Sequence, residues 1–217
     1  YNIYKVPGHF IHHGVANAFT VREIAAEVDG KIRVGFSGNL LRNDIDRNIF
    51  LQIIRENPGV VIECWGSHNL LDGNLGGVED TETINFIHQL KQSVNVILHG
   101  VVPAAILAKE FLRMDAFLIC YDVEKDQSRG TNYHKVMEYI STGKVIISNN
   151  ISTYKNEPSL VQMVKERSHN NNLPLLFKKV IQSLEIYNTA YLQKFRKEYA
   201  YDNTYRKQLE RIEKLLL

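Results

Sequence analysis

Short apolar runs alternate with amphipathic stretches along the chain from about residue 31 to residue 148. The runs KIRVGFSGNL, GVVIECWG, VNVILHG, DAFLICY and KVIISN each predict a buried strand. Between them, DIDRNIFLQIIREN, TETINFIHQLKQS, PAAILAKEFLRM and NYHKVMEYISTG have an apolar period of about 3.6 residues and predict helices. Pro103 suits the start of the third helix, and Gly143 suits the end of the fourth. This order predicts an α/β fold, a Rossmann-like doubly wound parallel sheet with ligands at the carboxyl ends of its strands.

Two flanking regions depart from this alternation. Residues 1–30 contain an apolar start, the His-rich turn HFIHHG and the segment FTVREIAAEV, which has a helical period. Residues 173–217 predict two helices broken near Asp202, and the last helix carries an apolar stripe that needs a partner. We expect a connector at 1–30, a sheet domain at 31–185 and extra C-terminal helices at 186–217. The stripe consists of Tyr201, Tyr205, Leu209, Ile212 and Leu216.

Composition excludes several classes of protein. A formal net charge of +2 and a pI near 8.4 are too mild to predict a nucleic-acid partner. Cys64 and Cys120 lie inside apolar runs, which predicts buried free thiols and a reducing, cytoplasmic location. No stretch approaches the roughly 18 apolar residues that span a bilayer. Because the chain begins at Tyr1 without a Met, we expect further residues upstream of it.

Glycine-bearing turns follow three predicted strands, in FSGNLLRND, ECWGSHN and LHGVVPA. Glycine lets backbone N–H groups approach a ligand, so a phosphate group is expected at Gly38, Asn39 and Leu40, although such turns are rich in glycine in any doubly wound sheet. The absence of GxGxxG after the first strand, of GxxxxGK[ST] and of GxSxG disfavours dehydrogenases, P-loop NTPases and α/β-hydrolases. The histidines show no metal-binding spacing, and no metal is expected; they include His12, His13, His68, His99 and His134.

The segment SRGTNYHKVMEYISTGKVIIS carries the most information. It places residues 129–132 in a turn that opens a helix, with Lys135 and Glu138 on neighbouring positions of one helical face. The helix N-terminus, Thr131 and Lys135 suit a diphosphate, and the paired oxygens of Glu138 suit two ribose hydroxyls. Spacing alone leaves open a second interpretation, in which Lys135 and Glu138 are a solvated pair worth a few tenths of a kcal/mol.

The same segment closely resembles the KxxEYLAxGKPVV signature of GT-B glycosyltransferases near families 1 and 4. The stretches VGFSGNLLRNDIDRNIFLQIIRENPGVVIECWGS and VNVILHGVVPAAILAKEFLRMDAFLICY resemble the strands, helices and glycine turns of their C-terminal donor domain. IYKVPGHFIHHGVANAF is similar to the connector that enters this domain, and YDNTYRKQLERIEKLL resembles its closing helix. The resemblance covers essentially the whole chain in the right order.

The resemblance implies roles for individual residues. Glu138 matches the glutamate that binds the donor ribose, and Lys135 with the turn at 130–132 matches the pyrophosphate region. Residues 99–101 match the loop beside the nucleotide base, and Gly38 with Asn39 matches the turn that faces the phosphates. Arg42 and Arg129 are candidates to neutralise phosphate charge. The implied nucleotide-sugar-binding residues are Gly38, Asn39, Arg42, His99, Gly100, Val101, Arg129, Gly130, Thr131, Asn132, Lys135 and Glu138.

The chain also departs from the family pattern. Many family 4 enzymes carry a second glutamate eight residues before the ribose glutamate, where this chain has Gly130. The basic pair that usually follows the first glycine turn is replaced by Gly38 and Asn39, with Arg42 as the nearby cation. These differences bear on the contacts with the donor sugar.

The implied function is transfer of a sugar from a UDP- or GDP-linked donor to a glycan or lipid-linked acceptor in polysaccharide biosynthesis. The resemblance implies no cofactor besides this donor substrate, and an N-terminal domain of the same chain as partner. The closing helices are expected to pack on that domain, and their basic residues are compatible with peripheral contact at the inner membrane face. Two alternatives stay open: a sugar-nucleotide 2-epimerase of the same fold, and a non-catalytic nucleotide-sugar-binding module.

Overall fold

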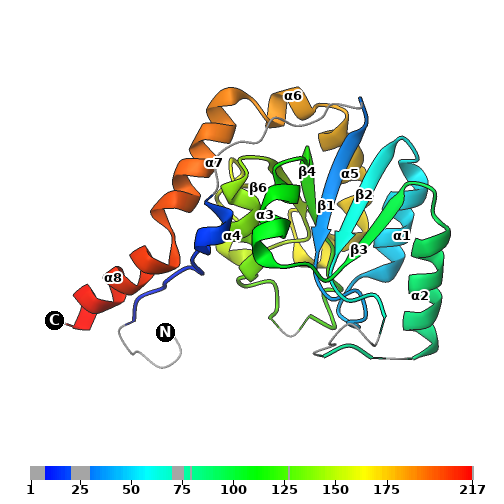
Figure 1. Ribbon diagram of the computed structural model, residues 1–217, viewed down its shortest axis with the longest axis horizontal. Helices are drawn as coiled ribbons and strands as arrows, with labels where there is room; N and C mark the ends of the chain where they lie inside the picture. The colour runs from blue at the N-terminus through cyan, green and yellow to red at the C-terminus, as the bar shows by residue number, and fades with distance from the viewer. Residues whose placement is uncertain (1–7, 21–29, 70–75, 79, 127, 217) are drawn as a thin grey trace.

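A computed structural model describes residues 8–20, 30–69, 76–78, 80–126 and 128–216. In these residues six parallel strands form one sheet in the order β3-β2-β1-β4-β5-β6, which confirms the predicted doubly wound fold (Figure 1). The carboxyl ends of the strands lie at the lower edge of the sheet in that view. The strands are β1 Ile32–Ser37, β2 Val60–Trp65, β3 Val96–Gly100, β4 Ala116–Ile119, β5 Val145–Ser148 and β6 Val161–Met163.

Helices cover both faces of the sheet. On one face lie α1 Arg47–Glu56, α2 Thr81–Gln92 and α5 Leu173–Ile181; on the other lie α3 Ala104–Phe111 and α4 His134–Ser141. Aromatic contacts mark the two halves of the core. Phe50 of α1 meets Phe36 of β1 edge to face at 5.0 Å, and on the opposite face Tyr139 of α4 stacks on Phe117 of β4 at 4.2 Å.

The strands and helices predicted between residues 31 and 148 are present, and their ends are set by local chemistry. Asp46 and Asp80 cap α1 and α2 by accepting hydrogen bonds from backbone N–H groups three residues later. Gly143, at φ +81°, ends the turn after α4 as predicted. The short strand β6 was not predicted, because only three residues of it pair with β5. Cys64 and Cys120 are buried free thiols, as expected.

The C-terminal region contains four helices where the sequence predicts two: α5, α6 Leu184–Tyr187, α7 Ala190–Asp202 and α8 Tyr205–Leu216. The predicted break near Asp202 is confirmed, since α7 ends there. Helix α7 packs on α4 and is anchored by Arg196, a side chain only 1% exposed. Its guanidinium donates hydrogen bonds to the carbonyls of Ser159 and Gly143, which fixes α7 on the sheet domain.

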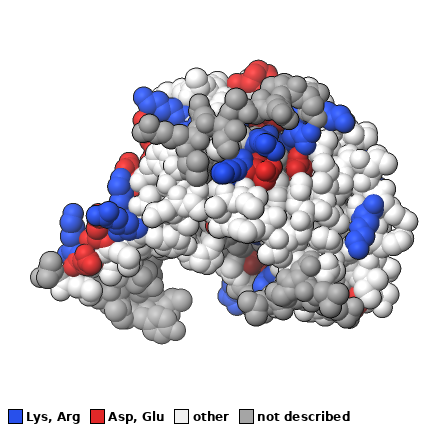
Figure 2. All heavy atoms as spheres, viewed as in Figure 1, with Lys and Arg blue, Asp and Glu red and all other residues white. Residues whose placement is uncertain are grey.

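Helix α8 projects away from the body of the domain beside the connector (Figure 1). Val15 of the connector forms a parallel bridge with Thr204, and Gly14 lies so close that an added Cβ would come within 2.4 Å of the Tyr205 nitrogen. Charged side chains gather along α7 and α8, whereas the face over α3 and α4 holds few (Figure 2). The apolar side chains Tyr205, Leu209, Ile212 and Leu216 are exposed.

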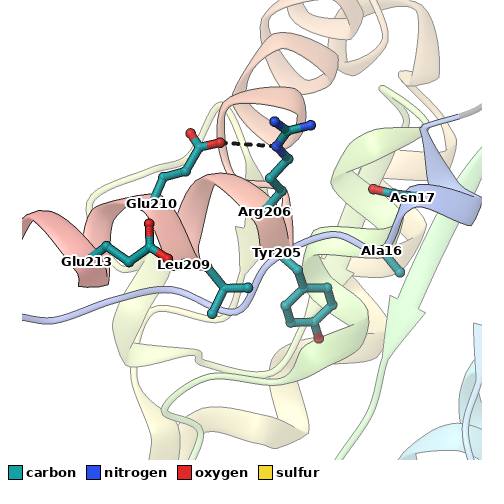
Figure 3. Close-up of a pocket in the computed structure, with 7 residues that line it drawn as sticks. All are labelled: Ala16, Asn17, Tyr205, Arg206, Leu209, Glu210 and Glu213. Carbon is teal, nitrogen blue, oxygen red and sulfur yellow. Dashed lines mark hydrogen bonds and ion pairs between the residues drawn. The ribbon is translucent and has the colours of Figure 1, made fainter.

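A pocket of about 550 Å³ lies between the connector and α8 (Figure 3). Its lining residues are Ala16, Asn17, Tyr205, Arg206, Leu209, Glu210 and Glu213. Arg206 and Glu210 form an ion pair along one side of the helix. Within the described residues, no helix is long and apolar enough to cross a membrane. The predicted helix in FTVREIAAEV lies mostly at 21–29, outside the described residues.

Candidate active site

The turns that follow β1 and β2 bind each other at the carboxyl edge of the sheet. The N–H groups of Gly38 and Leu40 donate to the carbonyls of Trp65 and Ser67, both at 2.9 Å. Gly66 has φ +128°, and an added Cβ there would lie 2.1 Å from the Gly38 oxygen. Two of the amides expected to meet a phosphate are therefore already engaged within the protein. These hydrogen bonds hold the two turns together, so side chains from elsewhere must supply the positive charge that an anion needs.

Lys135 supplies that charge from α4. Its ammonium donates hydrogen bonds to the Ser37 carbonyl, at the end of β1, and to the Tyr121 hydroxyl. It also lies 5.4 Å from the centre of the Phe36 ring, within cation–π range. An added Cβ at Gly38 would come within 2.7 Å of the Lys135 nitrogen. A side chain at position 38 would therefore displace the Lys135 ammonium from its place beside the glycine turn.

Glu138 lies one helical turn after Lys135 and is partly buried. Its carboxylate makes no hydrogen bond and no ion pair with the residues that the structure describes, and Lys135 interacts with it only at longer range. Burial raises the pKa of Glu138, and the nearby Lys135 charge opposes this only in part. The carboxylate thus has open lone pairs in a partly desolvated position, an arrangement suited to accept hydrogen bonds from a ligand.

The loop that leads into α4 is organised around Asp126. This carboxylate is 5% exposed and accepts hydrogen bonds from the Ser128 and Gly130 N–H groups and from the Ser128 and Tyr133 hydroxyls. Arg167 adds an ion pair at 3.2 Å. Burial alone would raise the pKa of Asp126, but these hydrogen bonds outweigh it and the pKa is lowered. Asp126 therefore holds the shape of the loop.

Two consecutive residues of this loop have positive φ, Arg129 at +52° and Gly130 at +65°. An added Cβ at Gly130 would lie 2.3 Å from an Arg167 nitrogen and 2.6 Å from the Asn150 carbonyl oxygen. The glutamate that many family 4 enzymes carry at this position therefore does not fit the loop as it is folded here. The side chain of Arg129 is exposed at the surface of the same loop.

The next two predicted residues differ in their contacts. The Thr131 hydroxyl donates to the Ser128 carbonyl at 2.8 Å, so it helps to close the loop. The Asn132 Oδ1 atom is buried and has no hydrogen-bond partner among the described residues. Beside it, the His13 ring of the connector packs against the His134 ring, tilted by 32° with centroids 3.6 Å apart. The connector thus packs on the first turn of α4, and its His12 and His13 side chains are partly buried.

Of the three residues predicted beside the nucleotide base, 99–101, only the last two lie at the carboxyl edge of the sheet. The His99 side chain stacks on Trp65 at 4.8 Å, and its Nε2 lies 2.7 Å from a Glu63 carboxylate oxygen. Gly100, at φ +74°, accepts a hydrogen bond from the Gly66 N–H, and Val101 is 61% exposed. The side chain of His99 is therefore committed to a contact on the sheet face, which leaves the backbone at 100–101 at the edge.

Glu63 was not singled out from the sequence, because it lies inside an otherwise apolar strand. Arg33 and His99 both bond its buried carboxylate. Burial raises the pKa of Glu63, but these two partners outweigh that effect and the pKa is lowered. The three residues line a cavity of about 340 Å³ together with Ile97, Glu110, Arg113 and Met114. The charged side chains that line this cavity pair with one another, since Arg113 also forms an ion pair with Glu110 at 3.3 Å.

Arg42 is paired within its own loop. Its Nε atom lies 2.9 Å and 3.1 Å from the two carboxylate oxygens of Asp44, and a second nitrogen binds the same group. Asp44 holds the pKa of Arg42 above its ordinary value. The positive charge of Arg42 is thus largely matched by Asp44, whereas Lys135 has no carboxylate within ion-pair distance among the described residues. Those residues also contain no group of three His, Cys, Asp or Glu side chains arranged to hold a metal ion.

Comparison with known proteins gives matches at the level of structure. No protein-family model and no curated protein sequence matches the chain. Anabaena HepE, solved in complex with UDP-glucose, superposes with a TM-score of 0.62 at 12% identity, over 87% of this chain and 49% of HepE. Sucrose-phosphate synthase from Thermosynechococcus elongatus gives 0.65 at 12% identity, over 94% and 49%. TarM from S. aureus, in a complex with UDP, gives 0.59 at 11%, over 90% and 38%.

The fold is that of a GT-B glycosyltransferase. The chain spans about half the length of HepE and of sucrose-phosphate synthase, so the match concerns part of a GT-B molecule. The predicted resemblance is confirmed for the fold. The GT-B fold also fits the location of Lys135 and Glu138, since ligands of doubly wound sheets bind at the carboxyl ends of the strands. At these identities the comparison concerns the fold, and the roles of single residues stay predictions.

Proposed function

We propose that this chain is the donor-binding domain of a glycosyltransferase that uses a UDP- or GDP-linked sugar. The observation that carries the proposal is the N-terminal part of α4, where the Lys135 ammonium reaches the glycine turn after β1 and the Glu138 carboxylate is left without a hydrogen bond to the described residues. A cation and a carboxylate one helical turn apart match the two polar parts of a nucleoside diphosphate, namely its phosphates and its ribose diol.

In this proposal the nucleotide lies along the carboxyl edge of the sheet. Lys135 and the N-terminus of α4 neutralise the diphosphate, and Glu138 accepts hydrogen bonds from two ribose hydroxyls. When the sugar is transferred, negative charge grows on the departing diphosphate, and the positive charge of Lys135 stabilises it in place. HepE, which shares the fold, was solved with UDP-glucose, and this supports a nucleotide sugar as the ligand class.

We infer that the acceptor site lies on a second domain of the same protein, since the chain spans about half of the matched structures. The exposed apolar side chains of α8 are then a surface for that domain. A glycan or lipid-linked acceptor, and a role in polysaccharide synthesis, belong to this proposal. This chain on its own is expected to bind the donor nucleotide without transferring sugar.

The test is calorimetric titration of the chain with UDP and with GDP. The unaltered chain should bind one of them, and Glu138→Ala should weaken that binding by about tenfold, because hydrogen bonds to a charged group contribute roughly 1.5–3 kcal/mol. Glu198→Ala, at an exposed position of α7, is the matched control and should leave binding unchanged. If neither nucleotide binds the unaltered chain, or if Glu138→Ala behaves like the control, the proposal is wrong.

A further inference from the structure

Tyr121 lies two residues after the end of β4, at the carboxyl edge of the sheet, and it was not singled out from the sequence. Its side chain is 8% exposed. The hydroxyl accepts a hydrogen bond from the Lys135 ammonium at 2.6 Å, and the ammonium also lies 5.2 Å from the centre of the Tyr121 ring. Tyr121 thus contacts the lysine that we assign to the diphosphate.

The backbone and ring of Tyr121 are themselves held from several directions. Its N–H donates to the Asn149 side chain at 3.0 Å, and its carbonyl accepts from the Asn170 side chain at 3.2 Å. Its ring packs on Tyr133 with centroids 4.7 Å apart. The Tyr133 hydroxyl in turn binds Asp126. These contacts fix the position of the Tyr121 hydroxyl, and Tyr133, from the loop that precedes α4, is one of them.

The three N–H donors of Lys135 can be shared between the protein and a ligand. A lysine ammonium has three N–H donors on a flexible four-carbon stem. In the described residues, two of the Lys135 donors bind the Ser37 carbonyl and the Tyr121 hydroxyl. Both acceptors are uncharged, so the positive charge is held in place without being neutralised. One donor is left for an oxygen of a ligand.

We propose that Tyr121 is a positioning residue of the donor site, which fixes the Lys135 ammonium so that its third N–H and its full charge meet the diphosphate. This inference rests on the proposed function, because it needs a diphosphate as the ligand. Without the hydroxyl, the ammonium has only the Ser37 carbonyl as a partner, and ligand binding must then immobilise the lysine stem.

The experiment compares Tyr121→Phe with Tyr154→Phe, using titration of UDP and GDP and of their nucleosides. Tyr154 is a buried tyrosine whose hydroxyl, among the described residues, donates a hydrogen bond only to the Met137 sulfur, so its variant controls for the loss of a buried hydroxyl. Tyr121→Phe should weaken diphosphate binding about five- to tenfold and leave nucleoside binding unchanged. Tyr154→Phe should change neither.

A double-mutant cycle with Lys135→Met separates positioning from a general structural effect. In the Lys135→Met background, Tyr121→Phe should have no further effect on diphosphate binding. Relaxation of the Lys135 side-chain carbons should also show greater motion in Tyr121→Phe than in Tyr154→Phe. If the unaltered chain binds the nucleotide but the two losses are additive, the role of Tyr121 is wrong and the donor site stands. If the unaltered chain binds no nucleotide, both proposals are wrong.

Discussion

Two carboxylates twelve residues apart, Asp126 and Glu138, lie on either side of the same turn and have opposite environments. Asp126 accepts hydrogen bonds from four donors and forms an ion pair with Arg167, and its pKa is lowered. Glu138 has no such partner among the described residues, and burial raises its pKa. Both carboxylates are at least partly buried, but within the described part of the chain only Asp126 has hydrogen-bond donors around it. A satisfied carboxylate holds a loop, whereas an unsatisfied one is available to a ligand.

Removing Asp126 should have the largest effect on stability. Asp126→Ala leaves the Arg167 charge and the Tyr133 hydroxyl without their partner, and we expect a loss of about 3 kcal/mol in the free energy of unfolding. Urea unfolding measures this. Asp122→Ala, in the same loop, removes hydrogen bonds to two exposed backbone N–H groups and should cost about 1 kcal/mol. Equal losses in the two variants would contradict the assignment of Asp126 as the centre of the loop.

The pH dependence of this effect has a definite sign. Because the pKa of Asp126 is lowered from its ordinary 3.8, its contribution is present above that value and is lost as the pH falls through the folded-state pKa. The difference in stability between the unaltered chain and Asp126→Ala should therefore shrink in acid. A difference that grows below about pH 3.8 would contradict the lowered pKa.

Gly130→Ala should have an intermediate effect on stability. The substitution places a Cβ at positive φ, which costs about 1–2 kcal/mol, and it forces Arg167 or the Asn150 carbonyl to move. Gly59→Ala is the control, since its Cβ would meet nothing within 4 Å, and it should change stability by less than about 0.5 kcal/mol. Urea unfolding of both variants checks this. If Gly130→Ala is as stable as Gly59→Ala, steric exclusion does not explain the absence of a glutamate at 130.

Glu138→Gln should have the smallest effect on stability, and of the opposite sign. The pKa of Glu138 is raised above 4.5, so the folded chain binds more protons than the unfolded chain just above that value, and stability is lost as the pH rises through the folded-state pKa. Near pH 7 the glutamine variant should be more stable by about 0.5 kcal/mol, seen as a rise of a degree or two in Tm. The gain should vanish near about pH 4. A lower Tm at pH 7 would show that Glu138 is a structural residue.

The fold could be predicted because its signals are local. Apolar runs and 3.6-residue periods mark each strand and helix, and they place Lys135 and Glu138 at the start of α4. The close contact between Gly38 and the Lys135 ammonium could not be predicted, since the lysine lies almost one hundred residues later in the chain. Tyr121 escaped notice for the same reason, since its partners Lys135, Asn149 and Asn170 come from distant parts of the chain. Asp126 binds mainly residues of its own loop, and a lone acidic residue in a polar loop gives no signal that it is buried. Strand β6 was not predicted, because three paired residues are too few to show an alternation of apolar and polar positions.

The contacts of Ser37 also have a meaning for folding. Its N–H donates to the Tyr139 hydroxyl and its carbonyl accepts from Lys135, across 102 and 98 residues of chain. Such bonds exist only after the two halves of the sheet have docked along β1 and β4, because loop closure over this length must precede them. Nucleotide binding at this turn would therefore report the completed domain, and a partly folded chain with only one half formed would escape detection by that assay.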